Sequence, residues 1–187
     1  MQLNYFNRPH FENGAIEKIS KVLKSHGIKN PLICSDPGLS SIGMTKKIGS
    51  LISDNLSPSF YEETPANPTE KAVSEALEIY KSNSCDGVIG FGGGSSMDLG
   101  KAVALMANHD GNLIDYSVVQ GGYKRITETV PMIAIPTTSG TGSEVSDGAL
   151  IIMNDGRKLI LASPHLRPNA AICDPELTIG LPPILTA

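Results

Sequence analysis

The chain has 187 residues, 40% of them hydrophobic and 18% charged, which fits one globular domain with a hydrophobic core and excludes a disordered chain. Its net charge is −4 and the charges are interspersed, so it lacks the basic stripe of a nucleic-acid-binding protein. No apolar run approaches the roughly 20 residues that cross a bilayer, and the first six residues lack a signal-peptide pattern. Three well-separated cysteines without metal-ligand spacing predict reduced thiols in a cytoplasmic protein.

Helix-period stretches alternate with short apolar runs along the chain. The first predicted helix ends near His26 and Gly27, and a later helix opens at Pro68. In chain order, the pattern predicts a helix over residues 16–23, a strand over 31–35, a helix over 42–52, a helix over 68–80, a strand over 88–91, a helix over 97–106 and a strand over 132–135. Two more apolar stretches, 149–153 and 159–162, flank an Asn-Asp-Gly turn sequence and predict a β-hairpin.

Strands separated by helices indicate βαβ units. The predicted fold class is therefore α/β, with a Rossmann-like parallel sheet flanked by helices and a β-hairpin insertion near 149–162. Ligands of such sheets bind at the carboxyl ends of the strands. The loops that follow the strands over 88–91 and 132–135 are therefore the candidate binding loops.

The first of these loops has the sequence GFGGGSSMD over residues 90–98. Glycines let the backbone turn sharply and approach a phosphate, and the free amides of the following helix would face that phosphate. Ser95 and Ser96 add hydroxyl donors, and Asp98 is predicted in the first helical turn, where it could stabilise the helix start or accept from a loop amide. The loop predicts a cradle for a dinucleotide pyrophosphate, although three glycines could also form a tight strand-to-helix turn without a ligand.

This loop departs from the common dinucleotide fingerprint. Ser95 stands where the last glycine of Gly-x-Gly-x-x-Gly belongs, and no acidic residue in the expected place about 20 residues later reads a ribose. The lysine–serine ending of a P-loop is also missing. The sequence therefore predicts a phosphate loop of a different family.

The second loop, residues 136–146, has the sequence PTTSGTGSEVS. Its hydroxyl residues and glycines place many small donors at the same edge of the sheet, where they could bond ribose or phosphate oxygens. A solvated surface loop of the same composition is the alternative.

Four segments together carry a family resemblance: GGGS at 92–95 with Asp98, Gly100-Lys101-Ala102, residues 136–145, and residues 171–177. They resemble the iron-containing alcohol dehydrogenase family over about Phe11 to Leu185. Glycerol dehydrogenases and dehydroquinate synthases share the glycine loop but not this form of the second loop.

The resemblance implies roles for residues of both loops. It implies that Gly93, Gly94, Ser95 and Asp98 hold the pyrophosphate region of NAD, with Ser96 beside them. It further implies that Thr137 and Thr138 lie along the cofactor, and that Ser146 lies near the nicotinamide, where the family usually has threonine.

Four other positions have two interpretations each. The resemblance makes Asp36 the acceptor for the adenosine ribose hydroxyls that favours NAD over NADP, whereas Asp-Pro-Gly could simply be a turn. It places Asn67 near the cofactor, but asparagine could equally cap the next helix. Lys158 resembles a lysine that reaches the cofactor and could instead be an exposed hairpin residue. Leu177 could touch the cofactor or belong to the core.

The resemblance also implies residues at the substrate end of the pocket. It places Gly148 and Leu150 near the carbon of the substrate that bears the alcohol. No short spacing joins the four histidines, and no segment has an Asp-x-x-x-His pair. In the resembling family, one aspartate and three histidines hold a divalent metal on a carboxyl-terminal helical domain, which is expected to be absent here.

The sequence therefore predicts that residues 1–187 are the dinucleotide-binding amino-terminal domain of a longer two-domain enzyme, without a metal site or activity of its own. In the whole enzyme, expected to be a homo-oligomer, Fe²⁺ or another divalent metal would lower the pKa of a small alcohol, and hydride would pass to NAD. The alternatives are a glycerol dehydrogenase-like or dehydroquinate synthase-like enzyme, and a non-catalytic module that binds NAD or ADP-ribose.

Overall fold

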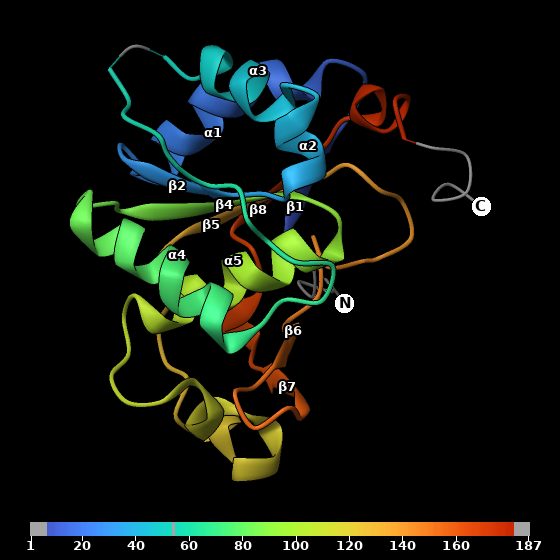
Figure 1. The fold of residues 1–187 in the computed structure, drawn as a ribbon. Helices are drawn as coiled ribbons and strands as arrows, with labels where there is room; N and C mark the ends of the chain where they lie inside the picture. Colours follow the sequence, from blue (N-terminus) through green and yellow to red (C-terminus); the bar gives the residue numbers. More distant parts are fainter. Residues whose placement is uncertain (1–6, 54, 182–187) are drawn as a thin grey trace, which may run out of the picture.

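A computed structural model describes residues 7–53 and 55–181. Residues 1–6, which lack a signal-peptide pattern, lie outside the described residues. So does Leu185, where the family resemblance was expected to end. Six parallel strands form one sheet in the order β1-β8-β5-β4-β2-β3 (Figure 1). Their bounds are β1 Arg8–Phe11, β2 Pro31–Cys34, β3 Ser59–Tyr61, β4 Gly87–Gly92, β5 Met132–Pro136 and β8 Ala170–Cys173. The α/β parallel sheet predicted from the sequence is confirmed.

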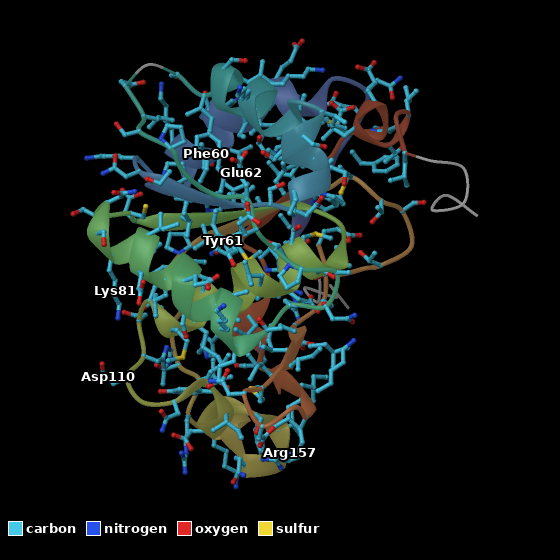
Figure 2. The ribbon with its side chains drawn as sticks, viewed as in Figure 1. Phe60, Tyr61, Glu62, Lys81, Asp110 and Arg157 are labelled. Carbon is cyan, nitrogen blue, oxygen red and sulfur yellow. The ribbon has the colours of Figure 1, made fainter. Side chains whose placement is uncertain are left out.

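Helices cover both faces of the sheet, as Figure 1 shows. One layer consists of α1 Ile19–Ser25, α2 Pro37–Ser41 and α3 Met44–Leu51, and the other of α4 Glu70–Ser82 and α5 Gly94–Met106. Each layer has its own hydrophobic cluster against the sheet. The neighbours Phe60 and Tyr61 of β3 divide between them, because side chains of a strand alternate between faces: Phe60 packs on the α3 side and Tyr61 on the α4 side (Figure 2).

A β-hairpin extends from the second layer, with β6 Gly148–Ile152 antiparallel to β7 Lys158–Ala162. This confirms the predicted hairpin. Six 3₁₀ segments complete the regular structure of the described residues: Ala15–Lys18, Leu113–Tyr116, Val118–Gln120, Gly122–Lys124, Pro164–Leu166 and Pro175–Thr178. Within the described part of the chain, no helix combines the length and apolar character needed to cross a membrane.

Most predicted elements are present, with shifted ends. Gly27 adopts φ 74° just after α1, which confirms the predicted stop. α5 begins at Gly94, three residues before its predicted start at 97. The sequence did not predict strands β1, β3 and β8, which have only three or four residues each. Length alone is not the reason, because β2 also has four residues and was predicted from its apolar run, a signal that β1 and β3 lack.

Two alternative interpretations from the sequence, a simple turn at Asp36 and a helix cap at Asn67, were wrong. The Asp-Pro-Gly segment at 36–38 is not a free turn, because Asp36 caps α2 by accepting a hydrogen bond from the Leu39 amide at 3.1 Å. Asn67 does not cap α4 either. Thr69 does so, accepting from the Ala72 amide at 3.1 Å, and the helix therefore begins at Glu70 rather than at Pro68.

Candidate dinucleotide-binding site

The strand order reverses between β2 and β4. β2 leads to β3 on one side of this point, whereas β4 leads to β5 on the other. In open parallel sheets, the crevice at the carboxyl ends of two such strands is the usual ligand site. Asp36 follows β2 and Gly93 follows β4, so two of the predicted cofactor residues flank this crevice.

Close packing in the glycine loop depends on two glycines. Gly92 has φ 142°, and a Cβ there would lie 2.6 Å from the Ser96 hydroxyl and 3.1 Å from the Asp36 carboxylate. A Cβ on Gly90 would lie 2.9 Å from the Cα of Met97 in α5. These glycines therefore bring strand, helix and Asp36 together, and a ligand is not needed to explain them.

The next two glycines, Gly93 and Gly94, face threonines of the second loop. Gly93 precedes α5, and no side chain caps this helix start. A Cβ on Gly93 would approach the Thr138 hydroxyl at 3.5 Å, and one on Gly94 would approach Thr141 at 3.4 Å, both ordinary contacts across the gap. Uncapped amides at the start of a 13-residue helix, opposite threonine hydroxyls, suit an anion such as a phosphate.

A pocket of about 570 Å³ opens on the α2 side of the glycine loop. It brings together most of the residues predicted to contact the cofactor: Asp36, Gly93, Gly94, Ser95, Ser96, Thr137, Thr138 and Leu177. Two of its wall residues have buried hydroxyls without a hydrogen-bond partner among the described residues, Thr64 and Thr138. Buried hydroxyls are normally paired, so these two lack the partner that such groups usually have. We call this cavity the first pocket.

A second pocket of about 480 Å³ lies between the glycine loop and the hairpin. It is lined by the other predicted site residues, Asn67, Asp98, Ser146, Gly148, Leu150 and Lys158. The Lys158 ammonium group donates to the Asn67 side-chain oxygen at 2.8 Å, so these two residues contact each other across the pocket. Gly94 and Ser95 line both pockets, which therefore meet at the start of α5.

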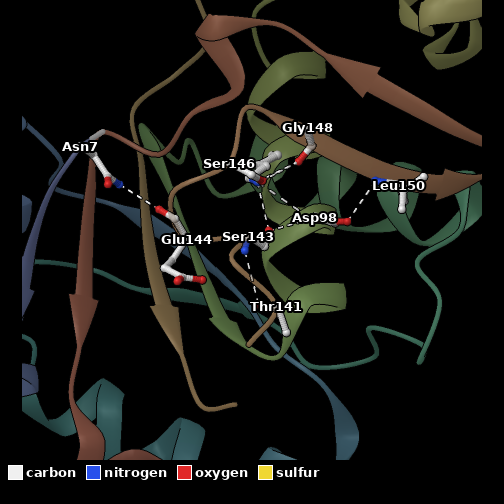
Figure 3. A network of polar contacts seen from close by, with 9 residues as sticks. Asn7, Asp98, Thr141, Ser143, Glu144, Ser146, Gly148 and Leu150 are labelled. Carbon is white, nitrogen blue, oxygen red and sulfur yellow. Dashed lines mark hydrogen bonds and ion pairs between the residues drawn. The ribbon is translucent and has the colours of Figure 1, made fainter. Parts of the chain in front are cut away.

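Asp98 does not lie at the start of α5. It is the fifth residue of that helix, and its carboxylate accepts from the Ser143 hydroxyl at 2.7 Å and from the Leu150 amide at 2.9 Å (Figure 3). The expected bond to a backbone amide is present, but the amide belongs to β6 and not to the glycine loop. Asp98 therefore joins the second loop and the hairpin to α5.

Lys101 is the residue of this region to which the sequence assigned no role. Its side chain is fully buried, and the ammonium group lies 4.0 Å from the Asp98 carboxylate. Burial lowers the pKa of Lys101 to about 8, opposed by the nearby carboxylates of Asp98, Asp147 and Glu144. A lysine one turn after an aspartate was visible in the sequence, but lysines are almost never fully buried, so nothing marked this one.

The other reactive side chains contribute no further site. Burial raises the pKa of the thiols of Cys34, Cys85 and Cys173, which keeps them protonated and unreactive. Among the residues that the structure describes, no three histidine, cysteine, aspartate or glutamate side chains are grouped as metal ligands would be. The described residues therefore do not fit a catalytic metal.

Comparisons with known proteins identify relatives of this chain. The chain is 45% identical over 184 residues to the 4-hydroxybutyrate dehydrogenase of Cupriavidus necator, covering 98% of this chain and 48% of that protein. It is 36% identical over 179 residues to alcohol dehydrogenase 4 of Schizosaccharomyces pombe, covering 95% of this chain and 42% of the relative.

Solved structures share the fold. A 1,3-propanediol oxidoreductase superposes with a TM-score of 0.89 at 28% identity, covering 97% of this chain and 48% of that one. A sulfoacetaldehyde reductase of Bifidobacterium kashiwanohense, solved with NAD⁺, superposes with a TM-score of 0.87 at 30% identity, covering 96% of this chain and 47% of that one. The chain thus spans about half the length of the relatives it matches. The model of the family described as iron-containing alcohol dehydrogenase matches residues 7–175, and this chain therefore belongs to that family.

Proposed function

We propose that this chain is the dinucleotide-binding domain of a longer two-domain alcohol dehydrogenase and that its cofactor is NAD. The observation that carries the proposal is the meeting of the two pockets at Gly94 and Ser95, beside the uncapped start of α5. A dinucleotide needs two cavities joined at an anion site, one for each nucleoside. The NAD⁺ complex of the reductase from Bifidobacterium kashiwanohense supports the same cofactor class.

The adenosine half is assigned to the first pocket. Asp36 lines it, and a carboxylate there would accept from the ribose hydroxyls and repel the 2′-phosphate of NADP. Gly93, Ser95 and Ser96 would hold the pyrophosphate, with the unpartnered hydroxyl of Thr138 across from them. The two unpartnered hydroxyls of this pocket and the uncapped start of α5 are the features of this structure that fit the cofactor.

The nicotinamide half is assigned to the second pocket. A nicotinamide held there would supply hydride transfer to or from the carbon of a small alcohol or aldehyde. Leu150 and Ile160 pair across the hairpin, and both line this pocket, so they offer an apolar wall to the ring and the substrate. Because a 4-hydroxybutyrate dehydrogenase is 45% identical, 4-hydroxybutyrate is the first substrate to test on the longer protein. The free cysteines support placing that enzyme in the cytoplasm.

Calorimetric titration of the 187-residue chain with NAD, NADP and ADP-ribose tests the cofactor assignment. NAD and ADP-ribose should bind, and NADP should bind more weakly because of Asp36. Failure of all three to bind at millimolar concentration would contradict the proposal.

Gly93→Val is the matched test of the pyrophosphate site. Gly93 has φ −76°, so valine is not strained by the backbone, but its side chain fills the gap toward Thr138. The variant should lose NAD and ADP-ribose binding at least tenfold while its melting temperature stays near that of the unsubstituted chain. Retained affinity in a folded variant would show that the phosphates lie elsewhere.

A further inference from the structure

Lys101 lies beneath the second pocket and has all three of its N–H donors engaged. Its ammonium group donates to the Ser143 hydroxyl at 3.0 Å, to the Ser146 hydroxyl at 2.9 Å and to the Gly148 carbonyl at 2.8 Å. Figure 3 shows these three acceptors gathered around the start of the hairpin. An ammonium group has three N–H donors and no acceptor, so the geometry fits the charged form of Lys101.

The two serines differ in where their own protons can go. Ser143 donates to the Asp98 carboxylate at 2.7 Å, a short and good bond. Among the described residues, the Ser146 hydroxyl has only the Gly148 carbonyl as an acceptor, at 3.4 Å, well beyond the roughly 2.8 Å of a good hydroxyl bond. Ser146 lines the second pocket, so its proton is available to a molecule bound there.

We propose that Lys101 is a positioning residue that holds Ser146 as a hydrogen-bond donor to the carboxamide oxygen of the cofactor's nicotinamide. This rests on the proposed function, which assigns the nicotinamide to the second pocket. A hydroxyl that accepts from an ammonium group cannot point its proton back at that group, and the charge strengthens its own donation. The apolar pair Leu150 and Ile160 suits the ring, whereas Ser146 offers the donor that the carboxamide oxygen requires.

Comparing the binding of two ligands distinguishes the Ser146–carboxamide hydrogen bond from contacts with the rest of the cofactor. ADP-ribose lacks the nicotinamide, whereas NADH carries it in an uncharged form. Because the ring is uncharged, removing the positive charge of Lys101 does not change NADH affinity by relieving charge repulsion with the ring. The measured quantity is the ratio of NADH to ADP-ribose affinity, by calorimetry on the 187-residue chain. Ser146→Ala should lower this ratio roughly tenfold, the effect of losing one charge-assisted hydrogen bond.

Lys101→Met should lower the ratio by a similar factor, and the double variant should lose no more than either single variant, because both substitutions remove one interaction. The matched control is Ser139→Ala, the same change at an exposed serine of the second loop that lines neither cofactor pocket. It should leave both affinities unchanged.

The pH dependence of the NADH to ADP-ribose affinity ratio in the unsubstituted chain distinguishes this role from a purely structural role of Lys101. The groups around Lys101 are Asp98 on α5 and Glu144 and Asp147 on the second loop and its extension, with Arg167 beside Asp147. The pKa of Lys101 is lowered to about 8, so the ammonium form is present below that pH and is lost above it. The NADH to ADP-ribose ratio should therefore fall above pH 8, and it should not change with pH in Lys101→Met.

An unchanged ratio in Ser146→Ala overturns the proposal, and an equal loss of both ligands does so too, because Ser146 would then contact the ribose. If Lys101→Met does not fold, the pH dependence of the unsubstituted chain decides: a ratio that falls above pH 8 supports the proposal and a constant ratio overturns it. Absence of binding by both ligands to the unsubstituted chain would instead overturn the proposed function.

Discussion

Asp36 has two roles in the structure, and two substitutions of this residue can distinguish them. Its carboxylate caps α2 through the Leu39 amide, and it also lines the first pocket. Asn is nearly as good a helix cap as Asp but has no charge. Asp36→Asn should therefore raise NADP affinity relative to NAD by roughly tenfold, about 1.4 kcal/mol, with little change in melting temperature. Calorimetry with both cofactors measures this.

Asp36→Ala serves as the comparison. It should relax cofactor selectivity to the same extent and also destabilise the chain by about 1 kcal/mol, since the α2 cap is lost. Unchanged selectivity in both variants would contradict the role assigned to Asp36, whatever happens to stability.

Residues of this site could be found from sequence where a local pattern marks them. Gly93, Ser95 and Thr138 stand directly after predicted strands, so parallel-sheet geometry alone brings them to one edge. Lys101 could not be found in this way. Its acceptors Ser143 and Ser146 are 42 and 45 residues away, and only the tertiary fold of the second loop places them over α5.

At the scale of the element, the contact of β4 with α5 depends on the absence of a side chain at Gly90. An alanine there would bring its Cβ to 2.9 Å from the Met97 Cα, which is backbone and can give way only if the helix moves. Gly90→Ala should lower the free energy of unfolding by about 1–3 kcal/mol. Because α5 carries the glycine loop, NAD affinity should fall with it.

Gly180→Ala is the control for that substitution, since an added Cβ there meets nothing within 4 Å. Urea unfolding of both variants gives the comparison. Equal stability of Gly90→Ala and the unsubstituted chain would show that α5 shifts freely, and the close strand–helix packing would not then position the loop.

The long helices were predictable from sequence, whereas the short helix α2 was not. α4 and α5 have 13 residues each, long enough for apolar positions to repeat, and both were predicted. α2 has only five residues, PGLSS, and none of them is buried, so no apolar pattern could reveal it. Its one sequence signal was Asp36 followed by proline, which predicts a turn and a capped helix equally well.

In the whole molecule, the hairpin is attached to the sheet domain through a shared hydrophobic cluster and by polar contacts from α5. Asp98 accepts from the Leu150 amide and Lys101 donates to the Gly148 carbonyl, so one helix fixes both the glycine loop at its start and β6 along its side. The two pockets are thereby held at a constant separation, as a ligand that spans both requires. Sequence periodicity predicted the hairpin but contained no information on where it would dock.

The division of the proposed enzyme into two domains can be tested through its metal dependence. The described residues contain no group of metal-ligating side chains, and the chain spans about half of its relatives' length. The 187-residue chain should therefore bind NAD, yet form no NADH from 4-hydroxybutyrate or a simple primary alcohol, with or without added Fe²⁺. Absorbance at the NADH band after anaerobic addition of the metal measures this. The matched comparison is the longer two-domain protein proposed above, which should form NADH in a metal-dependent way. Metal-dependent NADH formation by the 187-residue chain alone would contradict the division of labour proposed here, because a metal site would then have to be assembled from residues that the structure keeps apart.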